Sequence, residues 1–171
     1  MEFTFDTQYN AKTMAVMAKV LRKTIRKKHS RRSHVAGWII IVLAVLLLAV
    51  SGFTFDLRTV ATVTVVLVLL VTLLFEDRIN GYMAKKRLLT GTERAVTVFR
   101  ENGFLSTTEV GKTEWNYDKI LTVAETGDFF VFIFSVSHAQ LYDKRSLQEG
   151  TVEDFRRFIE AATEMHIQWI K

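Results

Sequence analysis

Histidine is the residue type through which this chain could most readily bind a metal, because the sequence contains no cysteine. Zinc sites pair histidine with cysteine or with a second histidine at a set spacing such as HExxH. Neither arrangement occurs around the four histidines, which are His29, His34, His138 and His166. We therefore predict no metal site and no cofactor.

A glycine-lysine-threonine sequence at 111–113 resembles the end of a phosphate-binding P-loop. A P-loop also needs a glycine five positions earlier and a helix directly afterwards. Here the earlier position is Ser106, and Trp115 with Asn116 continues a predicted strand. The sequence also lacks a GxSxG nucleophile elbow. We therefore expect no catalytic residues and no enzymatic activity.

Clustered cations offer a different chemistry, which is attraction to phosphate groups. The formal net charge is +5, and nine lysines and arginines lie between Lys12 and Arg32. Each cation near an anionic bilayer surface contributes about 1 kcal/mol. We predict membrane-surface contacts for Arg22, Lys23, Arg26, Lys27, Lys28, Arg31 and Arg32. A second pair, Lys144 and Arg145, either grips a phosphate-bearing headgroup or forms a solvated turn.

Two apolar runs follow this cationic cluster almost without interruption. The first, Val35 to Phe55, contains no charged residue, and the second, Leu57 to Phe75, has Arg58 near its start. A hydrocarbon core about 30 Å thick is crossed by roughly 20 helical residues. The pattern predicts a transmembrane helical hairpin at 35–75, with spans at 35–55 and 57–75.

Charge asymmetry predicts how this hairpin is oriented. Lysine and arginine are retained on the cytoplasmic side of a membrane. They dominate the segment before the first run and recur between Arg78 and Arg87, whereas the link between the runs has only Arg58 against Asp56. Both termini are therefore expected to be cytoplasmic.

The cationic segment also has helical periodicity. Asn10 can cap its start, and apolar residues recur at three- and four-residue spacing at Met14, Met17, Leu21 and Ile25. We predict a basic amphipathic helix at 10–34 and a connecting helix at 76–93. The apolar stripe of the first helix either lies on anionic headgroups or packs on the cytosolic domain. Packing is favoured, because positive-inside charge does not by itself indicate ligand binding.

From Arg94 onward the pattern becomes that of strands. The run AVTVF, then Asn102-Gly103, then FLSTTE predicts a hairpin with a tight primed turn. Further strands are predicted in KTEWNY, DKILTVAE, FFVFIFS and HAQLYDK, which together form an antiparallel meander. Both faces of 129–134 are apolar, so this strand is expected to be buried on two sides.

A helix is predicted to close this domain. Thr151 can cap it with Asp154, and its apolar face continues as far as Trp169. Residues 1–9 alternate as a strand does and are expected to join the cytosolic sheet, with the membrane hairpin inserted between the first and second strands. A free N-terminal tail is the alternative. The predicted fold class is α+β, with about seven antiparallel strands forming a barrel or sandwich closed by the C-terminal helix.

Trp115 has two interpretations. It is either a contact for a partner or a core ring whose indole N–H finds an acceptor, and the core interpretation is favoured.

Several motifs resemble a known family. Two apolar spans followed by FRENGFLSTT, EWNYDKI, ETGDFFVFIF, LYDKRSL and EDFRRFIE are similar to the YcxB-like bacterial membrane proteins, over nearly the whole chain. The family's tryptophan motif is matched by Glu114, Trp115 and Ile120, and its lysine-arginine pair by Lys144 and Arg145. Asp143 stands where the family commonly has proline, so the turn before that pair is expected to differ.

This resemblance implies a pleckstrin-homology-like cytosolic domain at 94–171 and a location in the bacterial cytoplasmic membrane. It implies no activity. The predicted function is a noncatalytic membrane-anchored adaptor whose cytosolic domain binds a protein segment or anionic lipid, with a protein partner or a homo-oligomer allowed and no nucleic acid. The alternative is a transporter or channel subunit built by oligomerisation of the two-helix hairpin. Spans without intramembrane charge argue against that alternative.

Overall fold

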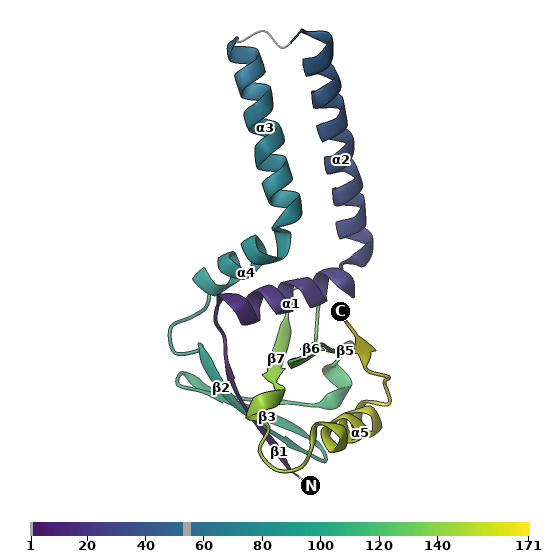
Figure 1. The fold of residues 1–171 in the computed structure, drawn as a ribbon. Helices are drawn as coiled ribbons and strands as arrows, with labels where there is room; N and C mark the ends of the chain where they lie inside the picture. The colour runs from purple at the N-terminus through teal and green to yellow at the C-terminus, as the bar shows by residue number, and fades with distance from the viewer. Residues whose placement is uncertain (1, 53–55) are drawn as a thin grey trace.

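The computed structural model describes residues 2–52 and 56–171, so the expected end of the first span, at Phe55, lies outside the described residues. Two long helices rise from a mixed domain that contains both termini (Figure 1). The helices are α1 Ala11–Lys23, α2 Lys27–Val50, α3 Leu57–Leu74, α4 Glu76–Lys86 and α5 Val152–Thr163. The strands are β1 Phe3–Gln8, β2 Arg94–Arg100, β3 Gly103–Thr108, β4 Gly111–Trp115, β5 Thr122–Glu125, β6 Phe129–Ile133, β7 Ala139–Asp143 and β8 Gln168–Trp169.

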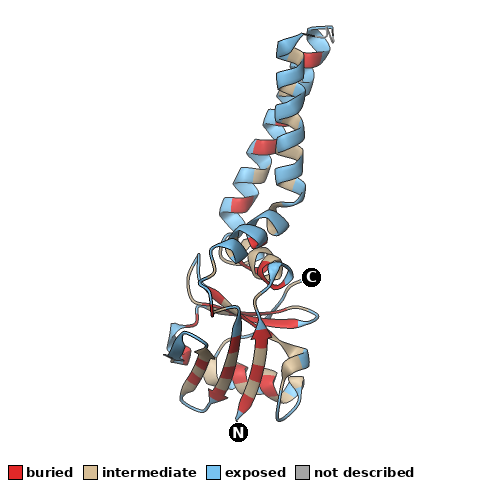
Figure 2. Cartoon of the chain, turned by 90° about the vertical axis from the view of Figure 1, so that its left-hand side faces the viewer, coloured by how far each residue is buried: buried red, intermediate tan, exposed pale blue. Residues whose placement is uncertain are grey.

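Helices α2 and α3 are each long and apolar enough to cross a membrane. Most of their surface is exposed, in contrast to the buried strands of the domain below (Figure 2). The helix predicted at 10–34 is divided in two, because the chain leaves helical geometry at Thr24 and starts again at Lys27. This break lets α1 lie across the domain while α2 points away from it (Figure 1).

The connecting helix is also shorter than predicted. It ends at Lys86 instead of at residue 93, and the chain then reaches β2 through a loop in which Gly91 has a φ of +87°. A non-glycine residue rarely adopts that conformation, so the helix cannot continue through this loop.

The first sheet has the order β1-β2-β3-β4 and is antiparallel throughout. Its edge strand β1 comes from the N-terminus and pairs with β2, with Phe5 opposite Thr97. The helical hairpin α2–α3 is therefore inserted between two neighbouring strands of one sheet.

The turn between β2 and β3 differs from the predicted primed turn. Arg100 pairs with Gly103, so Glu101 and Asn102 form the turn, and neither has a positive φ in the described backbone. Gly103 is needed for another reason. A Cβ placed on it would lie 2.4 Å from the Trp115 carbonyl oxygen, so only glycine allows this close approach.

The second sheet has the order β7-β6-β5-β8, and β8 runs parallel to β5. The prediction that the closing helix continues to Trp169 is wrong. Helix α5 ends at Thr163, because Glu164 takes the left-handed conformation, and Trp169 then pairs with Glu125 as part of β8. Strands and helices thus form an α+β domain with two four-stranded sheets, and the described strands do not close into one barrel.

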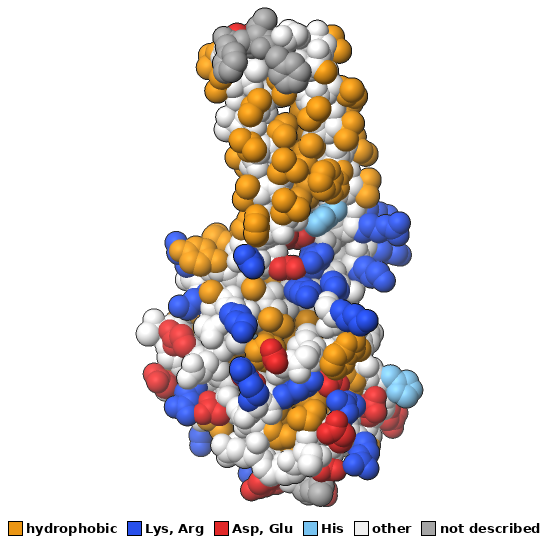
Figure 3. Space-filling model, in the orientation of Figure 1, with side chains coloured by type: hydrophobic (Ala, Val, Ile, Leu, Met, Phe, Trp, Pro, Cys, Tyr) orange, Lys and Arg blue, Asp and Glu red, His pale blue; other side chains and the backbone are white. Residues whose placement is uncertain are grey.

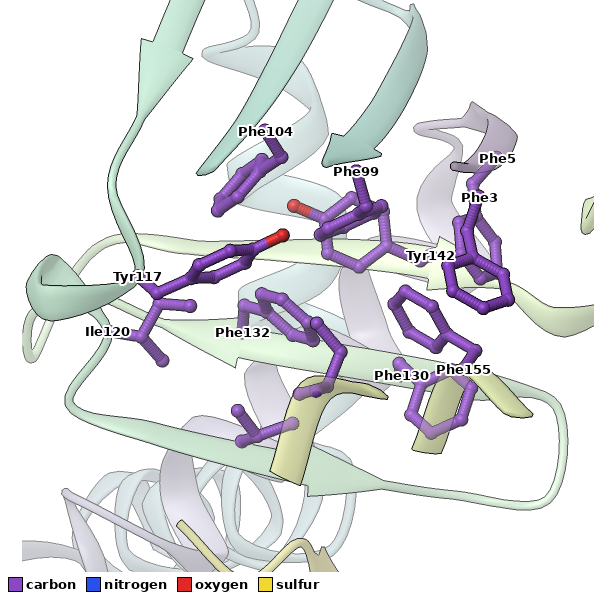
Figure 4. Packing of buried hydrophobic residues seen from close by; sticks show 12 residues of the cluster. Phe3, Phe5, Phe99, Phe104, Tyr117, Ile120, Phe130, Phe132, Tyr142 and Phe155 are labelled. Atoms are coloured by element: carbon purple, nitrogen blue, oxygen red, sulfur yellow. The ribbon is translucent and has the colours of Figure 1, made fainter. Parts of the chain in front are cut away.

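Aromatic rings fill the space between the two sheets and α5 (Figure 4). Phe99 lies at their centre, with ring centroids 5.0 Å from Tyr142 and 4.9 Å from Phe155. Phe3 and Phe5 bring β1 into the same cluster, and Phe5 lies 4.7 Å from Phe155. The capping box predicted for α5 is confirmed, with the Thr151 hydroxyl accepting from the Asp154 backbone N–H.

A second apolar layer lies between the second sheet and α1. Val20 and Leu21 of α1 pack with Val131 and Ile133, whereas Phe132 of the same strand faces the aromatic core. All five residues of β6 are buried, which confirms the prediction of a strand covered on both sides. The apolar stripe of α1 thus packs on the domain, and α4 lies against another side of α1 (Figure 1).

Candidate anion-binding site

A pocket of about 650 Å³ lies at the base of α2, where α1, α2 and the C-terminal segment meet. No acidic side chain of residues 2–52 or 56–171 lines it. Figure 3 shows lysine and arginine side chains gathered directly below the hydrophobic surface of the two long helices. The lining residues are Arg22, Lys23, Lys27, Ser30, Arg31, His34, Trp169, Ile170 and Lys171.

The break between α1 and α2 is what brings these cations together. The Arg26 backbone N–H donates to the Leu21 carbonyl over 2.9 Å, which turns the chain between the two helices. Along α2, the lining positions 27, 30, 31 and 34 recur at three- and four-residue spacing and so share one helix face. Lys28 and Arg32 do not line the pocket, although both are exposed on the same helix.

Two of the cations are held by other groups. Arg22 forms a bidentate contact with Asp77, at 2.7 Å from Nε and 2.6 Å from Nη2, and these hydrogen bonds raise the pKa of Arg22. Lys23 Nζ donates to the Lys171 carbonyl oxygen over 2.6 Å. Lys27 and Arg31, by contrast, form no salt bridge with any acidic side chain in residues 2–52 and 56–171.

Acidic residues at the start of α4 hold the pocket's two helices in place. His34 Nε2 lies 2.6 Å from Glu76 Oε2, so α2 is joined to α4. Arg22 joins α1 to the neighbouring Asp77. Lys27 and Arg31 therefore sit on a frame whose helices are cross-linked by polar contacts.

The remaining predicted contact residues have other positions. Arg26 donates from Nε to the Val136 carbonyl over 2.6 Å. Arg145 pairs with Asp143, at 2.7 Å from Nη2 to Oδ2. The Asp143 carboxylate also accepts the Arg145 backbone N–H, and it thereby caps the turn at the position where proline was expected. The structure does not bring Lys144 and Arg145 into the pocket at the base of α2.

Lys144 is a partly buried, paired residue and not a free surface cation. Its side chain is 11% exposed, and Nζ donates to Glu125 Oε1 and to the Thr126 carbonyl, both at 2.6 Å. Glu125 is 3% exposed and also receives a bidentate contact from Arg156, at 2.9 and 2.8 Å. Burial alone would raise the pKa of Glu125, but the hydrogen bonds from Arg156 and Lys144 lower it.

Sequence reasoning missed this Glu125 cluster. Glu125, Lys144 and Arg156 come from β5, a short turn and α5, so no local spacing connects them. The sequence contains one signal of this cluster, which is the position of Glu125 at the end of a strongly apolar strand pattern. A carboxylate that is buried with such a strand needs a cationic partner.

Trp115 packs at the edge of the aromatic core, as the favoured interpretation predicts. Its ring centroid lies 4.5 Å from Phe134 and 5.5 Å from His138, and burial lowers the pKa of His138. The acceptor predicted for its indole N–H is not found, since Nε1 is buried without a hydrogen-bond partner in the described part of the chain.

Metal-binding side chains are not grouped in the described ranges. Within residues 2–52 and 56–171, no three histidine or acidic side chains lie together in a way that could hold an ion. The lysine and arginine side chains that line the pocket at the base of α2 suit an anionic ligand.

Comparison with known proteins connects the chain to one family. A family model described as YcxB-like protein matches residues 99–159. This stretch runs from the end of β2 into α5 and includes Trp115, Lys144 and Arg145. No curated protein and no solved structure matches the chain. The resemblance expected from the sequence is confirmed over residues 99–159, and the protein carries a YcxB-like region there.

Proposed function

We propose that this protein is a noncatalytic, membrane-anchored interaction module that binds an anionic headgroup in the pocket at the base of α2. The observation that carries the proposal is the pair Lys27 and Arg31, which line that pocket without an acidic partner in the described chain, directly below an apolar helix. The proposed setting is a bacterial cytoplasmic membrane, with both termini in the cytoplasm.

Exposed apolar side chains support this setting. Leu47 of α2 is 59% exposed and Val68 of α3 is 59% exposed, and similar residues surround both helices (Figure 3). Apolar surface of this extent is costly in water and is typical of a membrane or partner contact. Trp38, one turn beyond the last lining residue of α2, suits the aromatic belt at a membrane interface.

The positions of the cations support the orientation. On the face shown in Figure 3 they gather at the end of the hairpin next to the mixed domain, which the positive-inside rule assigns to the cytoplasm. In that position the pocket lies at the depth of the inner-leaflet headgroups.

The chemistry of Lys27 and Arg31 suits a phosphate group. A guanidinium forms paired hydrogen bonds with phosphate oxygens, and an ammonium adds a compact positive charge. Arg31 and Lys27 supply one of each, four residues apart on the same face of α2. Two packed four-stranded sheets and a C-terminal helix support a pleckstrin-homology-like domain beneath the pocket.

A transporter or channel subunit is less well supported. Three threonine hydroxyls of α3 donate to carbonyls of their own helix: Thr62 to Arg58 and Thr64 to Val60, both at 2.8 Å, and Thr72 to Val68 at 2.7 Å. A polar pathway needs side chains that are available to a substrate or ion, and the donor hydrogens of these three hydroxyls are already bound within the helix.

The test compares two pairs of cations on one helix. Full-length protein is placed in nanodiscs that contain phosphatidylcholine with or without phosphatidylglycerol. The protein is then released from the nanodiscs, and the lipid that stays bound to it is measured by native mass spectrometry. Lys27→Gln with Arg31→Gln should weaken phosphatidylglycerol retention by about 2 kcal/mol, because each cation contributes about 1 kcal/mol. High salt should weaken it further.

The matched control is Lys28→Gln with Arg32→Gln, which removes the same charge from exposed positions outside the pocket. This variant should lose less retention than Lys27→Gln with Arg31→Gln, because its cations attract the bilayer surface but do not line the pocket that holds the headgroup. Equal losses in the two variants would contradict the proposal, because they would mean that the cations act only through general surface charge.

A further inference from the structure

The C-terminal residues form one wall of the pocket, although they belong to the second sheet of the domain. Trp169, Ile170 and Lys171 line it together with the cations of α1 and α2. Figure 1 shows this yellow segment ending beside α1, at the base of α2. Lys23 Nζ fixes its end by donating to the Lys171 carbonyl oxygen over 2.6 Å.

The other attachment of this wall is Glu125. Trp169 pairs with Glu125 in parallel register, and the Ile170 backbone N–H donates to the Glu125 carbonyl over 2.8 Å. A strand of two residues has few hydrogen bonds of its own, so its position depends on the side chains around it.

Lys144 supplies that side-chain support. Its Nζ binds Glu125 Oε1 at 2.6 Å and also lies 5.2 Å from the centre of the Trp169 ring. A cation at this distance from an indole is attracted to the ring face. Lys144 thus holds both the strand that carries the wall and the aromatic ring within the wall.

Trp169 is 56% exposed in spite of these contacts. An indole at the base of two apolar helices has the position of an interfacial tryptophan, which contacts the glycerol and upper acyl region of a lipid. Lys27 and Arg31 line the same pocket, and their side chains are of the types that bind phosphate oxygens.

We infer that the pocket binds a whole anionic phospholipid, with its phosphate on Lys27 and Arg31 and its glycerol region on Trp169, and that Lys144 is the positioning residue for the Trp169 wall. The inference rests on the proposed function and adds the ligand class and a residue outside the pocket. Inorganic phosphate and glycerol phosphate share the charged group but lack the acyl chains, so they separate a lipid from a soluble anion.

The experiment uses full-length protein in the same phosphatidylglycerol nanodiscs. Lys144→Gln should lower phosphatidylglycerol retention by about tenfold, a change equivalent to about 1.4 kcal/mol. Arg145→Gln is the matched control. It removes the same charge from the adjacent residue, which is exposed and bonds to Asp143 outside the wall. Lys144→Arg keeps the cation and should restore retention.

Trp169 emission gives a second readout that does not depend on retention. In a variant with Trp38→Phe and Trp115→Phe, Trp169 is the one remaining tryptophan. Its emission should move to longer wavelength with Lys144→Gln and remain unchanged with Arg145→Gln. Trp169→Ala, at an exposed position with little effect on folding, should weaken lipid retention to the same extent as Lys144→Gln.

Three results would overturn the inference. The first is equal retention in Lys144→Gln and Arg145→Gln while the original protein binds phosphatidylglycerol. The second is unchanged retention in Trp169→Ala. The third is displacement of the lipid by inorganic phosphate or glycerol phosphate, which would assign the pocket to a soluble anion. If the original protein retains no phosphatidylglycerol, the proposed function itself fails.

Discussion

Gly81 of α4 lies directly against Ala15 of α1. A Cβ placed on Gly81 would stand 2.4 Å from the Ala15 backbone nitrogen and 2.5 Å from its Cα. Backbone atoms cannot move aside as a flexible side chain can, so the two helices cross at this point only because residue 81 has no side chain. This crossing joins the helix after the hairpin to the helix before it.

Gly81→Ala should therefore destabilise the protein. Alanine is favoured over glycine inside a helix by about 1 kcal/mol, so helix propensity alone predicts the opposite result. The overlap with Ala15 should outweigh that gain and lower the free energy of unfolding by about 1 to 3 kcal/mol. Gly127→Ala is the control, since a Cβ there meets nothing within 4 Å. Thermal unfolding in detergent micelles measures both, and an unchanged or higher Tm for Gly81→Ala would contradict the observed packing.

Glu125→Gln should reduce stability near neutral pH. It breaks a buried ion cluster and leaves Lys144 and Arg156 without their anion, at a cost of about 3 to 5 kcal/mol. Glu153→Gln removes an exposed carboxylate from the same arginine and should change stability by less than about 0.5 kcal/mol.

The stability lost in Glu125→Gln should also depend on pH. Because the folded-state pKa of Glu125 is lowered from its ordinary 4.5, its contribution is complete above that value and disappears as the pH falls through the folded pKa. The difference in Tm between the original protein and Glu125→Gln should thus be constant from pH 7 to about 5 and shrink in more acidic solution. A difference that persists in strong acid would show that the carboxylate charge is not its source.

Phe5→Ala should destabilise the YcxB-like region although the residue lies far from it in sequence. Phe5 is fully buried among rings of both sheets and α5, and replacing such a phenylalanine with alanine costs about 3 to 5 kcal/mol. Limited proteolysis should then cut between Arg94 and Lys171 at protease concentrations that leave the original protein intact. Thr4→Ala, on the other face of β1, is the control. Equal protease resistance in the two variants would mean that β1 contributes little to the domain.

Membrane orientation can be measured with single cysteines, because the chain has none of its own. Leu57→Cys lies at the far end of the hairpin and Val110→Cys lies in the mixed domain, at residues that are 86% and 56% exposed. An impermeant thiol reagent added to intact cells should label only position 57, and permeabilised cells should be labelled at both. Labelling of position 110 in intact cells would contradict the proposed orientation.

Local patterns in the sequence predicted the local features of the fold well. The Asn10 and Thr151 caps, the two long apolar helices and the doubly buried β6 all follow from residues close together in the chain. Hydrophobic periodicity and capping residues report on immediate neighbours, so these features can be read without the tertiary structure.

Features that depend on distant residues could not be read in this way. The pocket at the base of α2 requires the break at Thr24 and the arrival of Trp169, which pattern reasoning placed on a helix. Similarly, Lys144 looked like a surface cation because its partner Glu125 lies on another strand. Gly103 matched a turn motif, but its real constraint is the approach of Trp115.

Inserting the helical hairpin between β1 and β2 also has a consequence for how the protein is made. Asp6 and Arg94, which bond across these two strands, are 88 positions apart, and both apolar helices are translated between them. During synthesis β1 therefore remains unpaired until the ribosome has translated the helical hairpin and then β2. The first sheet of the mixed domain can therefore form only after both apolar helices have been synthesised.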